Sequence, residues 1–170
     1  MINSVLSAFP FQEYENPGLE DLVIQVLEEN EPFKKYVQSR EKALNVIDEE
    51  PRPGGVYLHH QNTILLRRPL DEHVIAHEYA HAIDRALSYA SERPEFKNLY
   101  LAGGTAISHD AYFAPTEWFA ENLAAQAGWT QDGRTGDAAR SRLREVEPAA
   151  AAAFERLMRE HERERVGRGR

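Results

Sequence analysis

Residues 71–90 read DEHVIAHEYAHAIDRALSYA and predict one uninterrupted amphipathic helix. Asp71 suits the N-cap position, because its carboxylate can accept hydrogen bonds from the first backbone N–H groups of a helix. Neither Gly nor Pro interrupts the segment. Apolar side chains recur at spacings of three and four, which is the period of a helix with one buried face. These side chains are Val74, Ile75, Tyr79, Ala82, Ile83, Ala86 and Leu87.

This helix carries the motif His-Glu-Tyr-Ala-His at residues 77–81. Residues four apart share one helix face, so His77 and His81 can point their imidazoles at a single ion. Glu78 adds a carboxylate that can act as a base toward a water molecule. The alternative is a histidine pair that merely flanks the buried face. The adjoining Glu78 and the unbroken helix favour a Zn²⁺ hydrolase site instead.

A second helix is predicted over residues 114–123, and it carries Glu117 and Glu121 on one face. Catalytic zinc usually takes three protein ligands, so a carboxylate on this helix could complete the site with Glu117. The alternative is a solvated acidic face. Asp110 and His109 are rival third ligands from the preceding loop, but a loop would hold a ligand less rigidly than a helix.

Two further carboxylates could hold a ligand imidazole in its metal-binding tautomer by a hydrogen bond from its second ring nitrogen. Glu121 is well placed for this role, because it lies one helical turn after Glu117. Asp84 competes for the same role, because it lies one turn beyond His81. The sequence leaves both assignments open.

Residues 77–84, HEYAHAID, followed by 117–121, EWFAE, resemble the lethal-factor-like gluzincin metallopeptidases, which include the secreted Pro-Pro endopeptidases. The resemblance covers roughly residues 44–160. It implies a zincin-like fold, peptidase activity and bound Zn²⁺. It also implies roles for four residues: Glu117 as the third zinc ligand, Glu78 as the general base, and Asp84 and Glu121 as supporting carboxylates.

In that family, a tyrosine shortly before the third ligand stabilises the oxyanion of the reaction. Tyr112 is the nearest match, although it lies closer to Glu117 than the family spacing, so His109 and Tyr100 are alternative donors. Ala80 stands where the family usually has glycine. The additional methyl group predicts slightly looser packing at this point of the helix.

A β-hairpin is predicted just before the zinc helix, with strands over 56–60 and 63–66 and a turn at 61–62. An exposed strand edge there could pair with an extended peptide and hold it at the metal. The alternative is a small sheet that serves packing alone. His59 and His60 are interpreted as ordinary strand residues, because adjacent strand residues point to opposite faces and cannot easily share an ion.

The remaining chain predicts more helix. The segments are helices over about 19–29 and 32–44, a Pro/Gly-rich turn over 49–55, a connector or lid over 103–112, and a helix over 137–160 bent near Pro148. The expected fold is therefore α+β and mostly helical, a single zincin-like domain over 1–170. Within it we expect N-terminal helices over 1–43, a catalytic core over 44–160 and a basic tail over 161–170.

The composition limits which kinds of binding partner the chain can have. The formal net charge of −8 argues against a nucleic-acid-binding surface. No apolar run is long enough to cross a membrane, and no ordinary signal peptide is visible. The chain has no cysteine, so only nitrogen and oxygen ligands are available to zinc. These features fit a cytoplasmic protein, or one exported without a classical signal.

The sequence thus predicts a zinc metallopeptidase that acts on a peptide or protein substrate. Two alternatives stay open: a peptidase-related regulatory zinc protein, and a non-catalytic protein-binding module. Glu78 counts against the second alternative, because a pure binding module has no use for a base beside the metal.

Overall fold

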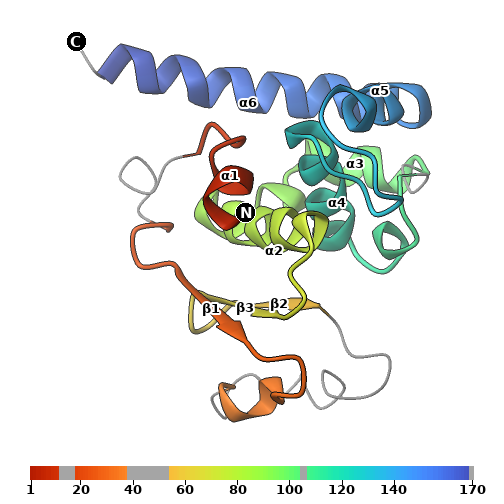
Figure 1. Cartoon of the computed structure of the whole chain (residues 1–170). Coiled ribbons are helices and arrows are strands. Elements are labelled where there is room, and N and C mark those ends of the chain that lie inside the picture. Colours follow the sequence, from red (N-terminus) through yellow and green to blue (C-terminus); the bar gives the residue numbers. More distant parts are fainter. Residues whose placement is uncertain (12–17, 38–53, 104–106, 169–170) are drawn as a thin grey trace.

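The computed structural model describes residues 1–11, 18–37, 54–103 and 107–168. A small sheet lies on one side of helix α2, α4 lies beside α2, and α5 and α6 lie on the side opposite the sheet (Figure 1). The strands are β1 (Val23–Leu27), β2 (Gly55–Leu58) and β3 (Thr63–Arg67). The α-helices are α1 (Ile2–Leu6), α2 (Glu72–Ala86), α3 (Pro94–Leu101), α4 (Pro115–Ala127), α5 (Asp137–Val146) and α6 (Pro148–Arg168). Short 3₁₀ helices are η2 (Phe33–Lys35), η4 (Ala90–Glu92) and η5 (Asp110–Tyr112).

The predicted hairpin is confirmed, and it forms part of a three-stranded sheet with the order β1-β3-β2. Strand β2 pairs antiparallel with β3, with Tyr57 opposite Ile64, whereas β1 pairs parallel with β3. Strand β3 is central and buried along its whole length. Strand β2 ends at Leu58, so His59 and His60 lie in the turn over 59–62 and not in a strand as predicted.

The helix predicted over 19–29 is wrong, because this segment contains strand β1. Val23, Ile24 and Val26 are β-branched, and such residues favour strands wherever a partner strand is present. Strand β3 provides that partner. The described part of the helix predicted over 32–44 contains only the 3₁₀ helix η2, and residues 38–44 lie outside the described residues. The turn predicted over 49–55 also lies largely outside them.

Helix α2 forms as its sequence predicts, although it ends at Ala86. The Asp71 carboxylate caps it by accepting hydrogen bonds from the backbone N–H groups of His73 at 2.8 Å and Val74 at 3.1 Å. Its apolar residues enter the main core, where they meet α4. Helix α4 is almost completely buried from Trp118 to Ala127, and Gly128 ends it with a positive φ of 123°. The two helices therefore pack side by side.

Gly55 brings β2 close to α2. A Cβ atom at this position would lie 2.7 Å from Val74 Cγ1 and 2.9 Å from Glu78 Cγ, both shorter than normal contact distances. A glycine is therefore needed where the strand crosses the helix turn that carries Glu78. The strand and the motif helix form one packed unit.

The helix predicted over 137–160 is two helices, α5 and α6, separated at Glu147. Pro148 begins α6, a position where its missing N–H is tolerated. The buried Glu147 carboxylate accepts hydrogen bonds from Trp118 Nε1 at 2.9 Å and from the backbone N–H of Ile107 at 3.1 Å. Helix α6 continues to Arg168, beyond the predicted end at Glu160.

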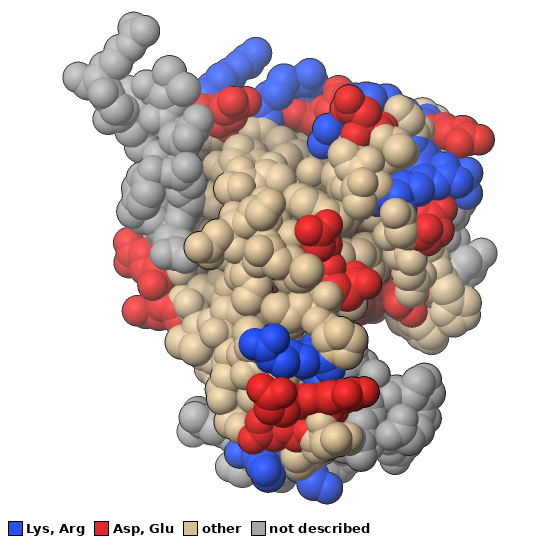
Figure 2. Space-filling model, in the orientation of Figure 1, with Lys and Arg blue, Asp and Glu red and all other residues tan. Residues whose placement is uncertain are grey.

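Charged side chains of opposite sign mix along α5 and α6, at the upper edge of the face in Figure 2. Glu155 accepts hydrogen bonds from Arg144, and Arg156 pairs with Glu95 of α3. Among the described helices, none combines the length and apolar character needed to cross a membrane.

Candidate metal centre

Helices α2 and α4 bring the two predicted histidines and Glu117 together. Glu117 Oε2 lies 3.2 Å from His77 Nε2 and 3.4 Å from His81 Nε2. The two Nε2 atoms are 3.1 Å apart. One atom from each residue thus occupies a corner of a nearly equilateral triangle.

The triangle fits a zinc ion. With bonds of about 2.0–2.1 Å to nitrogen and oxygen, tetrahedral Zn²⁺ holds its ligand atoms about 3.3 Å apart. The observed separations of 3.1–3.4 Å match this spacing. Two neutral imidazoles and a carboxylate form a donor set that zinc commonly takes, with a fourth position left for water. The residues therefore could hold a divalent metal ion.

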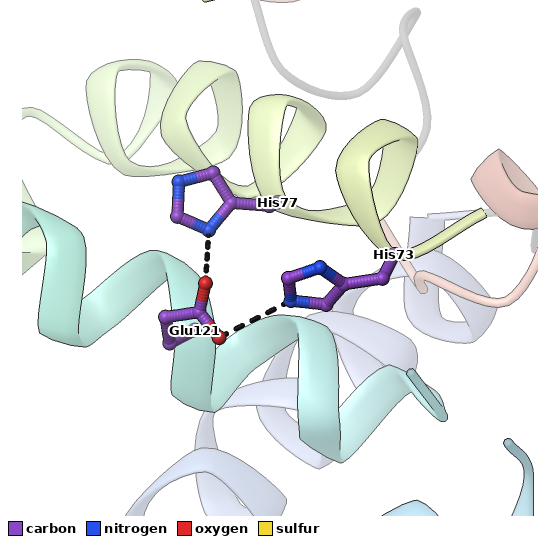
Figure 3. Close-up of side chains that lie close together, drawn as sticks. All are labelled: His73, His77 and Glu121. Atoms are coloured by element: carbon purple, nitrogen blue, oxygen red, sulfur yellow. Dashed lines mark hydrogen bonds and ion pairs between the residues drawn. The ribbon is translucent and has the colours of Figure 1, made fainter. Parts of the chain in front are cut away.

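Glu121 lies behind the triangle and contacts the other ring nitrogen of His77. Its Oε1 atom is 2.8 Å from His77 Nδ1, and its Oε2 atom is 3.2 Å from His73 Nε2. Figure 3 shows the two rings, one helical turn apart on α2, directed at the same carboxylate of α4. Glu121 is only 1% exposed. These three residues form a second set whose ligand atoms lie within 4.8 Å of one another.

The contacts between the helices shift the pKa values of the site. Burial raises the pKa of Glu117, but its contacts with His77 and His81 outweigh this and hold it well below the ordinary value. Burial likewise raises the pKa of Glu121. Its interactions with His73 and His77 outweigh burial and lower the pKa to about 2. Burial lowers the pKa of His77, and the two glutamates raise it well above 6.5. Both carboxylates are therefore anionic in the metal-free protein.

Glu78 is buried at the junction of α2 and β2. Burial raises its pKa, while His77, His81 and a backbone hydrogen bond from Tyr57 act in the opposite direction. A carboxylate with a raised pKa accepts a proton more readily than an ordinary glutamate, as a general base must. Glu78 also lines a cavity of about 600 Å³ together with His73, His77 and Glu121. That volume is typical of a small-ligand or peptide side-chain site.

The rival residues have other partners in the structure, although Asp110 also lines the cavity that contains Glu78. Asp110 accepts a hydrogen bond from Gln131 Nε2 at 2.8 Å. The His109 side chain is 79% exposed and packs edge-on against Phe113. The ring of Tyr100 packs on Trp118, at a centroid distance of 6.4 Å.

Two other predicted residues have different outcomes. Among the described residues, the Asp84 carboxylate forms no hydrogen bond with His77 or His81. It accepts hydrogen bonds from the backbone N–H and the hydroxyl of Ser91, at 2.8 and 2.7 Å. Tyr112 belongs to η5, just before α4, but its side chain lies outside the described part of the structure.

Two histidines near the centre were not predicted. His73 has a signal in the sequence, because it precedes His77 by the same four-residue step that separates His77 from His81. The ring of His59 lies 6.3 Å from that of His81 and 4.8 Å from that of Tyr57. No sequence pattern indicates His59, because its place depends on where β2 ends.

Acid should destabilise the metal-free protein through Glu121. Its pKa of about 2 lies below the ordinary 4.5, so it contributes stability above pH 4.5 that is lost as the pH falls toward 2. The raised pKa of His77 has the opposite sign, because its contribution is complete below pH 6.5 and is lost as the pH rises through the raised value. We expect the urea concentration at the unfolding midpoint, measured with chelator from pH 3 to 8, to decrease as the pH is lowered past 4.5. This decrease should be steeper in the wild type than in Glu121→Gln. Parallel curves would contradict this.

Comparisons with known proteins support the architecture. No family model matches the sequence, and no curated protein matches it. The structure is similar to that of the Pro-Pro endopeptidase PPEP-2 from Paenibacillus alvei, with a TM-score of 0.56 and 20% sequence identity. The similarity covers 91% of this chain and 83% of the other. At this identity the likeness shows the fold, which is α+β and zincin-like with a small sheet beside the motif helix.

Proposed function

We propose that this chain is a zinc-dependent metallopeptidase of the gluzincin type, with His77, His81 and Glu117 as ligands. The observation that carries the proposal is the ligand triangle, whose separations of 3.1–3.4 Å match a tetrahedral zinc site. The buried Glu78 beside this triangle supplies the base that a hydrolase needs. The similarity of fold to a Pro-Pro endopeptidase agrees with this function.

Each residue of the site has a task in the proposed reaction. When bound, Zn²⁺ polarises the scissile carbonyl and makes an adjacent water molecule easier to deprotonate. Glu78 takes the proton from that water as its oxygen attacks the carbonyl carbon. Glu78 then passes the proton to the nitrogen of the breaking C–N bond, which leaves as an amine. Glu121 keeps His77 oriented through its Nδ1 atom.

A hydrogen-bond donor is also needed for the negative oxygen that forms on the attacked carbonyl. Tyr112 is the proposed donor and His109 the alternative. Both are in or beside η5, which leads into the helix that carries Glu117. Substitutions of these two residues can therefore be compared in the same assay.

The substrate is proposed to bind as an extended peptide along β2. The strand order leaves β2 at an edge of the described sheet, and Gly54 and Gly55 line the cavity that contains Glu78. Main-chain hydrogen bonds to a strand edge hold a peptide without regard to its sequence, and side-chain pockets then select among peptides. The cavity of about 600 Å³ is the nearest candidate for such a pocket.

The proposal is tested by incubating zinc-loaded protein with a diverse peptide library and identifying products by mass spectrometry. We expect cleavage that stops when a chelator removes zinc and returns when zinc is restored. Stoichiometric zinc without cleavage of any peptide would contradict peptidase activity and favour the regulatory or binding alternative. Unchanged cleavage in the chelated protein would contradict the role of the metal.

A further inference from the structure

The contact between His73 and Glu121 extends the candidate metal centre by one residue. The His73 ring contacts the Glu121 carboxylate, which contacts the His77 ring, and His77 is one corner of the ligand triangle. In Figure 3 the two rings approach the carboxylate from the same helix, one at each oxygen. Glu121 therefore has both of its oxygens engaged by α2.

The burial of Glu121 makes its second contact important. A charged carboxylate with 1% exposure is costly unless it is paired and hydrogen-bonded. His73 Nε2 lies within hydrogen-bond distance of Oε2, at 3.2 Å, and His77 Nδ1 forms an ion-pair contact with Oε1 at 2.8 Å. Without His73, the Glu121 carboxylate would be free to rotate, and its contact with His77 Nδ1 would no longer be fixed.

We propose that His73 is a positioning residue of the metal centre, which fixes the Glu121 carboxylate so that it holds His77 with Nε2 directed at the ion. The inference rests on the proposed function, because it assumes that His77, His81 and Glu117 are the ligands. His73 itself does not contact the ion or the substrate in this role. In this role its Nε2–H donates to Glu121 Oε2, and the other carboxylate oxygen pairs with His77 Nδ1 at 2.8 Å.

The position of His73 in the helix suits this task. It lies in the first turn of α2, one turn before His77, and its backbone N–H is held by the Asp71 cap at 2.8 Å. The backbone is thus fixed independently of the imidazole, whose exposure is 15%. A substitution at this site should remove the hydrogen bond and leave the helix intact.

The competing reading is that His73 is itself a ligand, in a set with His77 and Glu121. That set would need His77 Nδ1, the atom already 2.8 Å from Glu121, to face the ion. The triangle with His81 and Glu117 leaves that contact intact. It also places three ligand atoms at tetrahedral spacing. The observations therefore favour a positioning role, and the experiment separates the two.

The test measures zinc affinity by competition with a chromogenic chelator. In His73→Phe the ring remains and the hydrogen bond is lost, so the Kd for zinc should rise by about tenfold, the lower end of the effect seen when partners of ligand residues are removed. In His73→Gln an amide N–H can replace Nε2–H, so the Kd should return close to the wild-type value. His60→Phe, in the turn after β2, is the matched control and should leave the Kd unchanged.

A double-mutant cycle checks that His73 acts through Glu121. In a Glu121→Gln background, His73→Phe should change the Kd by much less than in the wild type, because the carboxylate it fixes is gone. Equal effects in both backgrounds would overturn the proposal, as would an unchanged Kd in His73→Phe. A Kd in His73→Gln as weak as in His73→Phe would also overturn it and identify His73 as a ligand.

Zinc affinity separates this inference from the proposed function. Wild-type protein that binds zinc but cuts no peptide would refute the peptidase and leave the affinity series interpretable. An active wild type with an unchanged Kd in His73→Phe would refute only the role of His73. Wild-type protein that binds no zinc would overturn both.

Discussion

Glu78→Gln should lower kcat for peptide hydrolysis by roughly 10²–10⁴-fold, the usual contribution of a positioned general base. The amide keeps the size of the side chain but cannot take a proton from water. Glu78 is not part of the ligand triangle, so the variant should still bind one zinc ion per chain. The loss should appear in kcat more than in KM, because proton transfer belongs to the transition state. Steady-state kinetics and metal analysis of the same preparation measure both quantities.

Matched variants show whether such a loss is specific. Glu95→Gln removes an exposed carboxylate of α3, which pairs with Arg156 away from the ligand triangle, and should leave kcat unchanged. Tyr112→Phe and His109→Ala belong in the same series, and the one that lowers kcat with zinc retained identifies the oxyanion donor. Full activity in Glu78→Gln would show that Glu78 is not the base.

Glu117→Ala should abolish stable zinc binding. The substitution leaves two histidines, whereas catalytic zinc sites usually have three protein ligands. After dialysis against a weak chelator, the wild type should keep close to one zinc ion per chain and the variant close to none, as measured by atomic emission. Peptidase activity should disappear in parallel.

Asp110→Ala is the control for that experiment, because Asp110 is the rival ligand and instead binds Gln131. It should retain zinc. A Glu117→Ala variant that keeps stoichiometric zinc, alongside an Asp110→Ala variant that loses it, would show that the third ligand is wrongly assigned. Circular dichroism of both variants confirms that each remains folded.

The part of the site that the sequence predicts is the part that depends on local spacing. His77, Glu78 and His81 lie on one helix, and their relation follows from the helical period alone. Glu117 was predicted because a carboxylate on a second helix could complete the set, and the structure places it at the two histidines. The α+β class follows from the same helices and the hairpin.

The features that the sequence does not predict depend on contacts between distant segments. Strand β1 is a short apolar run, and such a run is ambiguous until β3 provides a partner. Whether Asp84 or Glu121 would hold a histidine depended on which helix packs against α2. In the structure the Asp84 carboxylate accepts hydrogen bonds from Ser91, and α4 brings the Glu121 carboxylate to His77 and His73. Nothing in the order of residues fixes these pairings.

Glu147 connects the candidate metal centre to the C-terminal helices. Glu147 lies at the break between α5 and α6, and its buried carboxylate accepts a hydrogen bond from the indole N–H of Trp118. Trp118 is the immediate neighbour of Glu117 in the sequence. It also holds the backbone of Ile107, in the segment that leads into α4. The junction of α5 and α6 is therefore fixed by hydrogen bonds to α4 and to the segment that precedes it. The motif on α2 contributes one side of the candidate centre. A helix break about seventy residues later in the chain helps to hold α4, which contributes the other side.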